Sequence, residues 1–216
     1  MSRVTPGRFV EWLTDRRLIV RFSALAAAAA ALFVTCWWLA FLLLPVGLLR
    51  GRTGAAALAG GDQAAVSFAV EFLRLFALNF SIAALVIVAP NLLRTRRGVP
   101  LGYWSALMII GVAAVVTGTN SFSIRIGPAA KLAPSLELLG NPGPYELAAY
   151  ILAATATCGI GRWQLVGRWP RSTAPRIDPK PRPLSLPQQW LGLGVATATL
   201  LATAAWEASR VLATVD

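Results

Sequence analysis

The stretch that decides the fold is residues 22–49, FSALAAAAAALFVTCWWLAFLLLPVGLL, an uncharged run of 28 residues between Arg21 and Arg50. At about 1.5 Å per residue, a helix of this length exceeds the roughly 30 Å hydrocarbon core of a bilayer. A secretory signal peptide would have a much shorter apolar core followed by a small-residue cleavage site. The sequence therefore predicts a retained membrane span and an integral membrane protein.

The composition excludes several kinds of site. The chain contains no histidine, so neither a Ser-His-Asp triad nor a histidine-bearing metal site can form, and we expect no cofactor and no metal. The net charge is +11, and the basic residues lie in connections that flank apolar stretches. This placement is typical of membrane topology rather than of a nucleic-acid-binding face, so we expect no nucleic-acid partner.

Apolar stretches recur along the chain and predict an all-α fold, a polytopic membrane helix bundle with about five transmembrane helices, interfacial helices and one broken, re-entrant segment. The predicted order is a cytoplasmic interfacial segment (1–21), span 1 (22–49), an outer amphipathic connection (50–74), span 2 (75–93), span 3 (101–124), a broken re-entrant segment with span 4 (132–161), a cytoplasmic Pro/Arg-rich linker (162–189) and span 5 (190–212).

The basic residues predict the orientation. Fourteen of the twenty lie before span 1, between spans 2 and 3, or between spans 4 and 5. Because positive charge is retained on the cytoplasmic side, we expect a bacterial cytoplasmic membrane protein with its N-terminus in the cytoplasm and its C-terminus outside.

The linker is rich in proline, which disfavours helix and favours an extended chain. A spacer is the favoured interpretation. The alternative is that its basic side chains dock a cytosolic partner or lie along anionic lipid, the residues concerned being Arg171, Arg176, Lys180 and Arg182.

Polar side chains within the apolar stretches are costly in a membrane, so each needs a partner or a purpose. One interpretation is hydrogen bonding that holds helices together, helped by neighbouring small residues. The other is a polar pocket that opens to the outer face. Its candidate residues are Asn79, Thr119, Asn120, Asn141, Tyr145 and Glu146.

Glu146 is the only acidic residue well inside a predicted span. It follows the helix-breaking sequence 140–144, GNPGP, so it lies in the first turn of a new helix, where the helix dipole favours a carboxylate. Alternatively, it binds a cation, a basic peptide group or a partner's arginine. The residues leave these two interpretations equally open.

The central part of the chain, from about residue 75 to 162, resembles the stage II sporulation protein M family. The resemblance is carried by an Asn early in span 2, a glycine-punctuated span 3, and the sequences Asn141-Pro142-Gly143-Pro144-Tyr145-Glu146-Leu147-Ala148 and Cys158-Gly159-Ile160-Gly161. Family members show a Pro-His-Gly turn before the aromatic-Glu pair. Pro142 stands in place of that histidine, so any role of the histidine is absent here.

The resemblance implies an integral membrane component without a soluble catalytic domain. Members of the family organise a cell-wall-degrading complex, or are encoded with ATP-binding cassette subunits and take part in export, immunity or maturation of ribosomally made peptides. We therefore expect a non-enzymatic membrane subunit, a scaffold or permease-like component of an envelope complex that works with an ATP-binding cassette ATPase.

The alternative is a membrane maturase for a ribosomally made peptide, with Glu146 as an acid-base group near Asn120 and Asn141. In either case the expected partners are the lipid bilayer, other membrane or cytosolic subunits and a peptide substrate. A small-solute carrier is the least favoured function, since the chain has no evident inverted repeat.

Overall fold

The computed structural model describes residues 7–50, 67–122, 130–167, 173–177 and 187–213. In this part of the chain, four helices are long and apolar enough to cross a membrane. They are α2 (Leu18–Leu43), the segment Phe68–Leu92 that begins with α4 (Phe68–Ser81), α5 (Leu101–Gly118) and α7 (Pro187–Leu212). The prediction of a mostly helical chain with helices able to span a membrane is thereby confirmed.

Two of the predicted spans end earlier than the hydropathy pattern indicates. Helix α2 ends at Leu43 rather than at residue 49, because Pro45 lacks a backbone N–H and Gly47 adopts a φ of 71°. Helix α5 ends at Gly118 rather than at residue 124, and Asn120 takes a left-handed φ of 49°. Neither of these helix ends can be recognised from apolar composition alone.

The outer connection (50–74) and span 2 (75–93) are predicted as separate segments, but in the structure the helix continues across the boundary between them. One helical segment begins at Phe68 and continues through η1 (Ile82–Val88), which is π-helical, and η2 (Ala89–Leu92), which is a 3-10 turn. Pro90 lacks a backbone N–H, and its ring crowds the preceding turn. The change from π-helical to 3-10 geometry, between Val88 and Ala89, lies next to this proline. Residues 51–66 of the predicted connection fall outside the described part.

The predicted broken segment (132–161) consists of η3 (Leu136–Gly140), the helix α6 (Gly143–Ala156) and η4 (Cys158–Ile160). The break lies where the Gly-Asn-Pro-Gly sequence predicts it. The part before the break is a single 3-10 turn rather than a helical arm. Helix α6 has 14 residues, about 21 Å, which is shorter than a typical hydrocarbon core. The five-span count, and with it the placement of the termini on opposite sides, stays a prediction.

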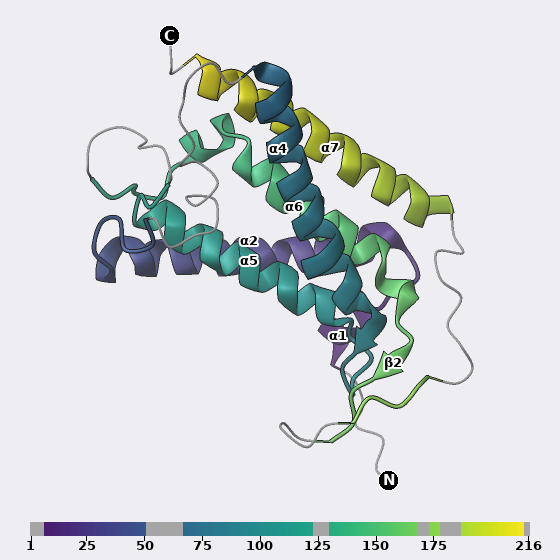
Figure 1. The fold of residues 1–216 in the computed structure, drawn as a ribbon. Coiled ribbons are helices and arrows are strands. Elements are labelled where there is room, and N and C mark those ends of the chain that lie inside the picture. The colour runs from purple at the N-terminus through teal and green to yellow at the C-terminus, as the bar shows by residue number, and fades with distance from the viewer. Residues whose placement is uncertain (1–6, 51–66, 123–129, 168–172, 178–186, 214–216) are drawn as a thin grey trace. The chain divides into compact units, whose positions relative to one another are not determined.

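The described chain divides into two compact units. The first comprises residues 1–27, 68–106 and 142–216, and contains α1 (Arg8–Leu13), α4, α6 and α7. Helix α6 packs against α7 and against η1, and α4 packs against α7 (Figure 1). A two-residue parallel pair joins β1 (Leu93–Arg94) to β2 (Trp163–Gln164).

Small residues allow the close packing of the first unit. A Cβ on Gly192 of α7 would lie 2.7 Å from Leu18 Cδ2 and 3.2 Å from Ala156 Cβ. Ala154 and Ala204 are also completely buried. Glycine and alanine let helix backbones approach, which is how membrane helices gain packing energy without a hydrophobic driving force.

The second unit comprises residues 28–67 and 107–141. Here Gly118 of α5 packs against α2, because a Cβ at Gly118 would lie 2.8 Å from the Trp37 carbonyl oxygen and 2.9 Å from Ala40 Cβ. Trp37 Nε1 donates a hydrogen bond of 2.8 Å to the Leu132 carbonyl, and Lys131 Nζ donates one of 2.7 Å to the Phe41 carbonyl. These bonds fasten the segment after α5 to the C-terminal half of α2.

Candidate functional site

The site of interest in the first unit is built on α6 and the two helices that flank it. Helix α6 begins at Gly143, with Pro144 in its first turn, where its missing N–H costs nothing. Glu146 follows in the same turn, and its backbone N–H bonds to the Pro142 carbonyl at 3.2 Å. Tyr150 lies one turn further along, on the same face of the helix.

A chain of hydrogen bonds links α6 to α4. Tyr150 donates its hydroxyl proton to Asn79 Oδ1 at 3.0 Å, and Asn79 Nδ2 donates to Glu146 Oε1 at 2.8 Å. Asn79 and Tyr150 are buried, with exposed fractions of 7% and 4%. The Asn79 amide is therefore bonded to α6 at both ends, and it fixes the orientation of the Glu146 carboxylate.

The third helix, α7, adds a hydroxyl and one charged residue to this group. The Thr203 hydroxyl of α7 lies beside the Glu146 carboxylate, and Glu207 lies one turn further along α7. On α4, the buried Glu71 forms an ion pair of 3.1 Å with Arg74. Among the described residues, no basic side chain forms an ion pair with Glu146. The donors that hold its carboxylate in this part of the chain are neutral.

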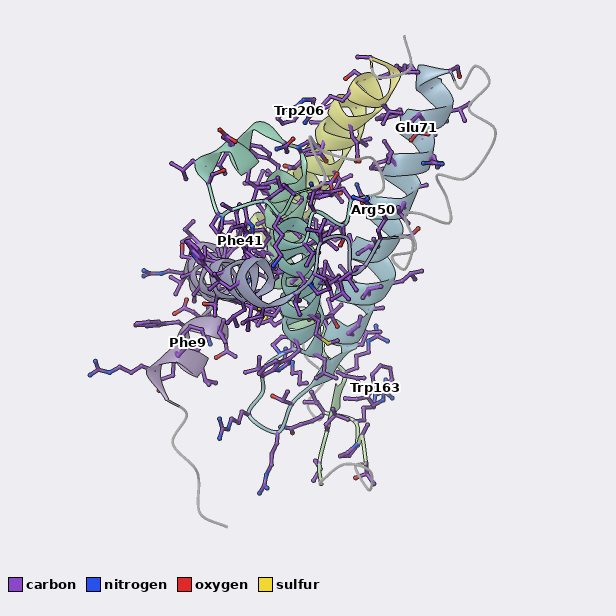
Figure 2. All side chains as sticks on the ribbon, turned by 90° about the vertical axis from the view of Figure 1, so that its left-hand side faces the viewer. Phe9, Phe41, Arg50, Glu71, Trp163 and Trp206 are labelled. Carbon is purple, nitrogen blue, oxygen red and sulfur yellow. The ribbon has the colours of Figure 1, made fainter. Side chains whose placement is uncertain are left out.

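A shallow groove of about 410 Å³ runs along α7 next to this carboxylate. Tyr145 and Trp206 form its aromatic wall, with ring centroids 6.0 Å apart and planes inclined at 48°. Trp206 projects from the side of α7 that faces away from α4 (Figure 2). Thr203 belongs both to the groove and to the surroundings of Glu146. The lining residues are Tyr145, Val195, Ala198, Thr199, Ala202, Thr203 and Trp206.

The predicted pocket residues are divided between the two units. Asn79, Tyr145 and Glu146 lie together in the first unit, as described above. Thr119, Asn120 and Asn141 belong to the second. The single pocket that joins all six residues stays a prediction.

In the second unit, Thr119 and Asn120 directly follow Gly118, the last residue of α5. The Thr119 hydroxyl contacts the Ser121 hydroxyl at 2.6 Å, and Asn120 Nδ2 donates to the Ala130 carbonyl at 2.9 Å. Arg50 Nη2 donates to the Asn120 carbonyl at 2.9 Å. Asn141 Nδ2 lies 3.4 Å from the Glu137 carbonyl. Thr119 and Asn120 are completely buried, and their hydrogen bonds hold the adjoining loops to the end of α5.

The predicted docking residues lie mainly outside the described part of the chain, which omits Arg171, Lys180 and Arg182. Arg176 is described and exposed, and its backbone forms a bridge with Trp163 next to β2. A role of these residues in docking stays a prediction.

Tyr150 and Thr203 belong to this site but are not among the residues predicted from the sequence. Tyr150 could have been found, because it lies four residues after Glu146 and therefore on the same helix face. Thr203 carries no such signal, since its position depends on how α7 packs against α6. Within the described residues, no group of three or more His, Cys, Asp or Glu side chains could hold a metal ion.

Comparison with known proteins yields no relative. No family model matches the chain, and neither a curated protein nor a solved structure matches it.

Proposed function

We propose that this chain is a non-enzymatic membrane subunit, a scaffold or permease-like component of a bacterial envelope complex, which works with an ATP-binding cassette ATPase in export. The observation that carries the proposal is the groove on α7 with the Glu146 carboxylate behind it. A carboxylate within a helical membrane protein is costly, and most such groups pair with a cation or mark a functional site.

A basic side chain from the membrane helix of another subunit fits this groove. Alanines at 198 and 202 let a partner helix approach closely. Tyr145 and Trp206 offer ring faces to a guanidinium or ammonium group, a contact that contributes about 0.5–2 kcal/mol. Thr203 leads from the groove to Glu146, which supplies the opposite charge.

The energy for export has to come from another chain. The sequence contains no G-x-x-x-x-G-K-[ST] phosphate-binding motif. This is the reason for including an ATPase among the proposed partners.

Site-specific photocrosslinking in native membranes tests the proposal. A photoreactive residue at Ala198 should form one discrete protein adduct, whereas one at Leu85, a highly exposed residue of η1, should react with lipid. We expect mass spectrometry to identify a membrane subunit with a basic residue in a span, co-purifying with an ATPase. Recovery of the chain alone, with lipid adducts at both positions, would count against a subunit role.

A charge reversal sharpens the test. Glu146→Lys should abolish the Ala198 adduct, and replacing the partner's basic residue with Glu should restore it. Failure of every basic position in the partner helix to rescue Glu146→Lys would refute the ionic contact while leaving a subunit role intact.

One observation favours a second function, that of a maturase for a ribosomally made peptide. Asn79 and Tyr150 fix the Glu146 carboxylate, as acid-base catalysis requires. Under this proposal Glu146→Gln abolishes peptide processing while the protein remains folded. Full processing by the variant would eliminate it.

A further inference from the structure

One end of the first unit is strongly cationic. Contacts define this end: Tyr103 Oη at the start of α5 donates to the Leu13 carbonyl at 3.1 Å, and Gln188 at the start of α7 bonds to Leu18 and Arg16. Its described residues include two acids, Glu11 and Asp15, and nine arginines, which are Arg8, Arg16, Arg17, Arg21, Arg94, Arg96, Arg97, Arg162 and Arg176.

At the opposite end of the same unit, the acidic residues outnumber the basic ones. It holds Glu71, Glu146 and Glu207 with Arg74 and Arg210. In Figure 2, Trp163 lies at the cationic end, and Glu71 and Trp206 lie at the other. The unit is therefore electrically asymmetric along its length.

Five of the arginines gather at one corner, around the β1–β2 pair, and one of them, Arg94 of β1, donates to the Cys158 carbonyl at 3.0 Å. Arg96 and Arg97 occupy a tight turn closed by the bond from Gly98 N–H to the Thr95 carbonyl, at 2.8 Å. Gln164 Nε2 of β2 donates to the Arg96 carbonyl at 3.1 Å, which holds the turn beside Trp163. Arg162 precedes Trp163, and Arg176 is bridged to it.

The four other arginines at this corner are exposed. In the described part of the chain, none of them makes a hydrogen bond or ion pair through its side chain. The other arginines at this end behave differently. Arg21 is buried and donates to the carbonyls of Thr155, Asp15 and Arg16, so it serves the fold.

Exposed tryptophans surround the same end. The exposed fractions are 53% for Trp12, 57% for Trp104, 37% for Trp163 and 60% for Trp190. Trp104 and Trp190 lie in the first turn of α5 and α7, two of the helices long enough to span. Exposed tryptophan at the ends of spans is typical of the headgroup layer of a bilayer, and it distinguishes this surface from one that binds nucleic acid.

We propose that the corner formed by Arg96, Arg97, Arg162 and Arg176 beside Trp163 is a docking site for the phosphate headgroup of an anionic phospholipid. Charge complementarity selects the ligand, because the guanidinium fork matches phosphate and no acid of the described corner competes for it. The tryptophan places the corner at headgroup depth. The inference concerns the end opposite the α7 groove, so it does not depend on the proposed function.

Lipid titration of the purified full-length protein, followed by native mass spectrometry, tests the site. We expect phosphatidylglycerol to bind more tightly than phosphatidylcholine. Arg97→Gln should weaken phosphatidylglycerol binding roughly fivefold, and Arg96→Gln with Arg97→Gln about 30-fold, as expected for basic side chains near a membrane surface. Arg97→Lys keeps the charge but loses the guanidinium fork, so it should weaken binding less than Arg97→Gln, which separates loss of charge from loss of folding.

Matched controls and competitors decide the outcome. Arg210→Gln removes one charge from the opposite end and should leave the phosphatidylglycerol affinity unchanged. Equal binding of the two lipids, or an equal loss in Arg210→Gln and Arg97→Gln, would overturn the proposal. Inorganic phosphate at millimolar concentration should not displace the lipid, and complete displacement would assign the site to free phosphate instead.

Discussion

Replacing Asn79 with alanine tests the hydrogen-bond chain at the centre of the candidate site. The substitution removes the 2.8 Å bond to Glu146 Oε1 and the 3.0 Å bond from the Tyr150 hydroxyl, and both groups lose their partner on α4. A hydrogen bond to a charged group contributes about 1.5–3 kcal/mol, and side-chain bonds between membrane helices average about 0.6 kcal/mol. We therefore expect the free energy of unfolding to fall by about 2–3 kcal/mol.

The measurement is equilibrium unfolding in mixed detergent micelles, followed by far-ultraviolet circular dichroism. Tyr150→Phe removes a single bond and should cost about 0.6 kcal/mol. In a double-mutant cycle, Asn79→Ala and Glu146→Ala should show a coupling energy of at least about 0.5 kcal/mol, because the two side chains are in contact. Thr199→Ala, on the groove face of α7, serves as the uncoupled control. Additive effects for Asn79 and Glu146 would refute the reasoning.

Two further substitutions test other parts of the fold by the same unfolding measurement. Gly102→Ala should destabilise the protein by about 1–3 kcal/mol, because a Cβ there would overlap the backbone carbonyl of Ile87. The control is Gly111→Ala, in open space on the same helix, which should be neutral or stabilise by up to about 1 kcal/mol. Equal effects of the two substitutions would contradict the packing at Gly102. Arg21→Ala should lower the free energy of unfolding by about 2–4 kcal/mol, since it leaves the Thr155 carbonyl at the C-terminus of α6 without its charged donor. An unchanged midpoint of the unfolding transition would show that this buried bond does not contribute to stability.

The polar residues of the candidate site could be recognised from the sequence one at a time, but their partners could not. Asn79 and Glu146 stand out because a polar side chain in an apolar stretch needs a reason. They are 67 residues apart, and only the tertiary fold, in which α7 packs against both α4 and α6, brings them together. Thr119 and Asn120 stand out in the same way, yet their described contacts secure the end of α5 and the loops beside it.

The local chemistry of the chain determined that this is a helical membrane protein, because long uncharged runs and a break at Gly-Asn-Pro-Gly act within a few turns of helix. Which face of each helix is buried was decided only by the tertiary structure. Arg21 looks like a polar boundary before an apolar span, but in the fold it is buried and bonds to Thr155, 134 residues away. Burial of such a group depends on which carbonyls another helix presents to it, and hydropathy along one segment contains no information about that.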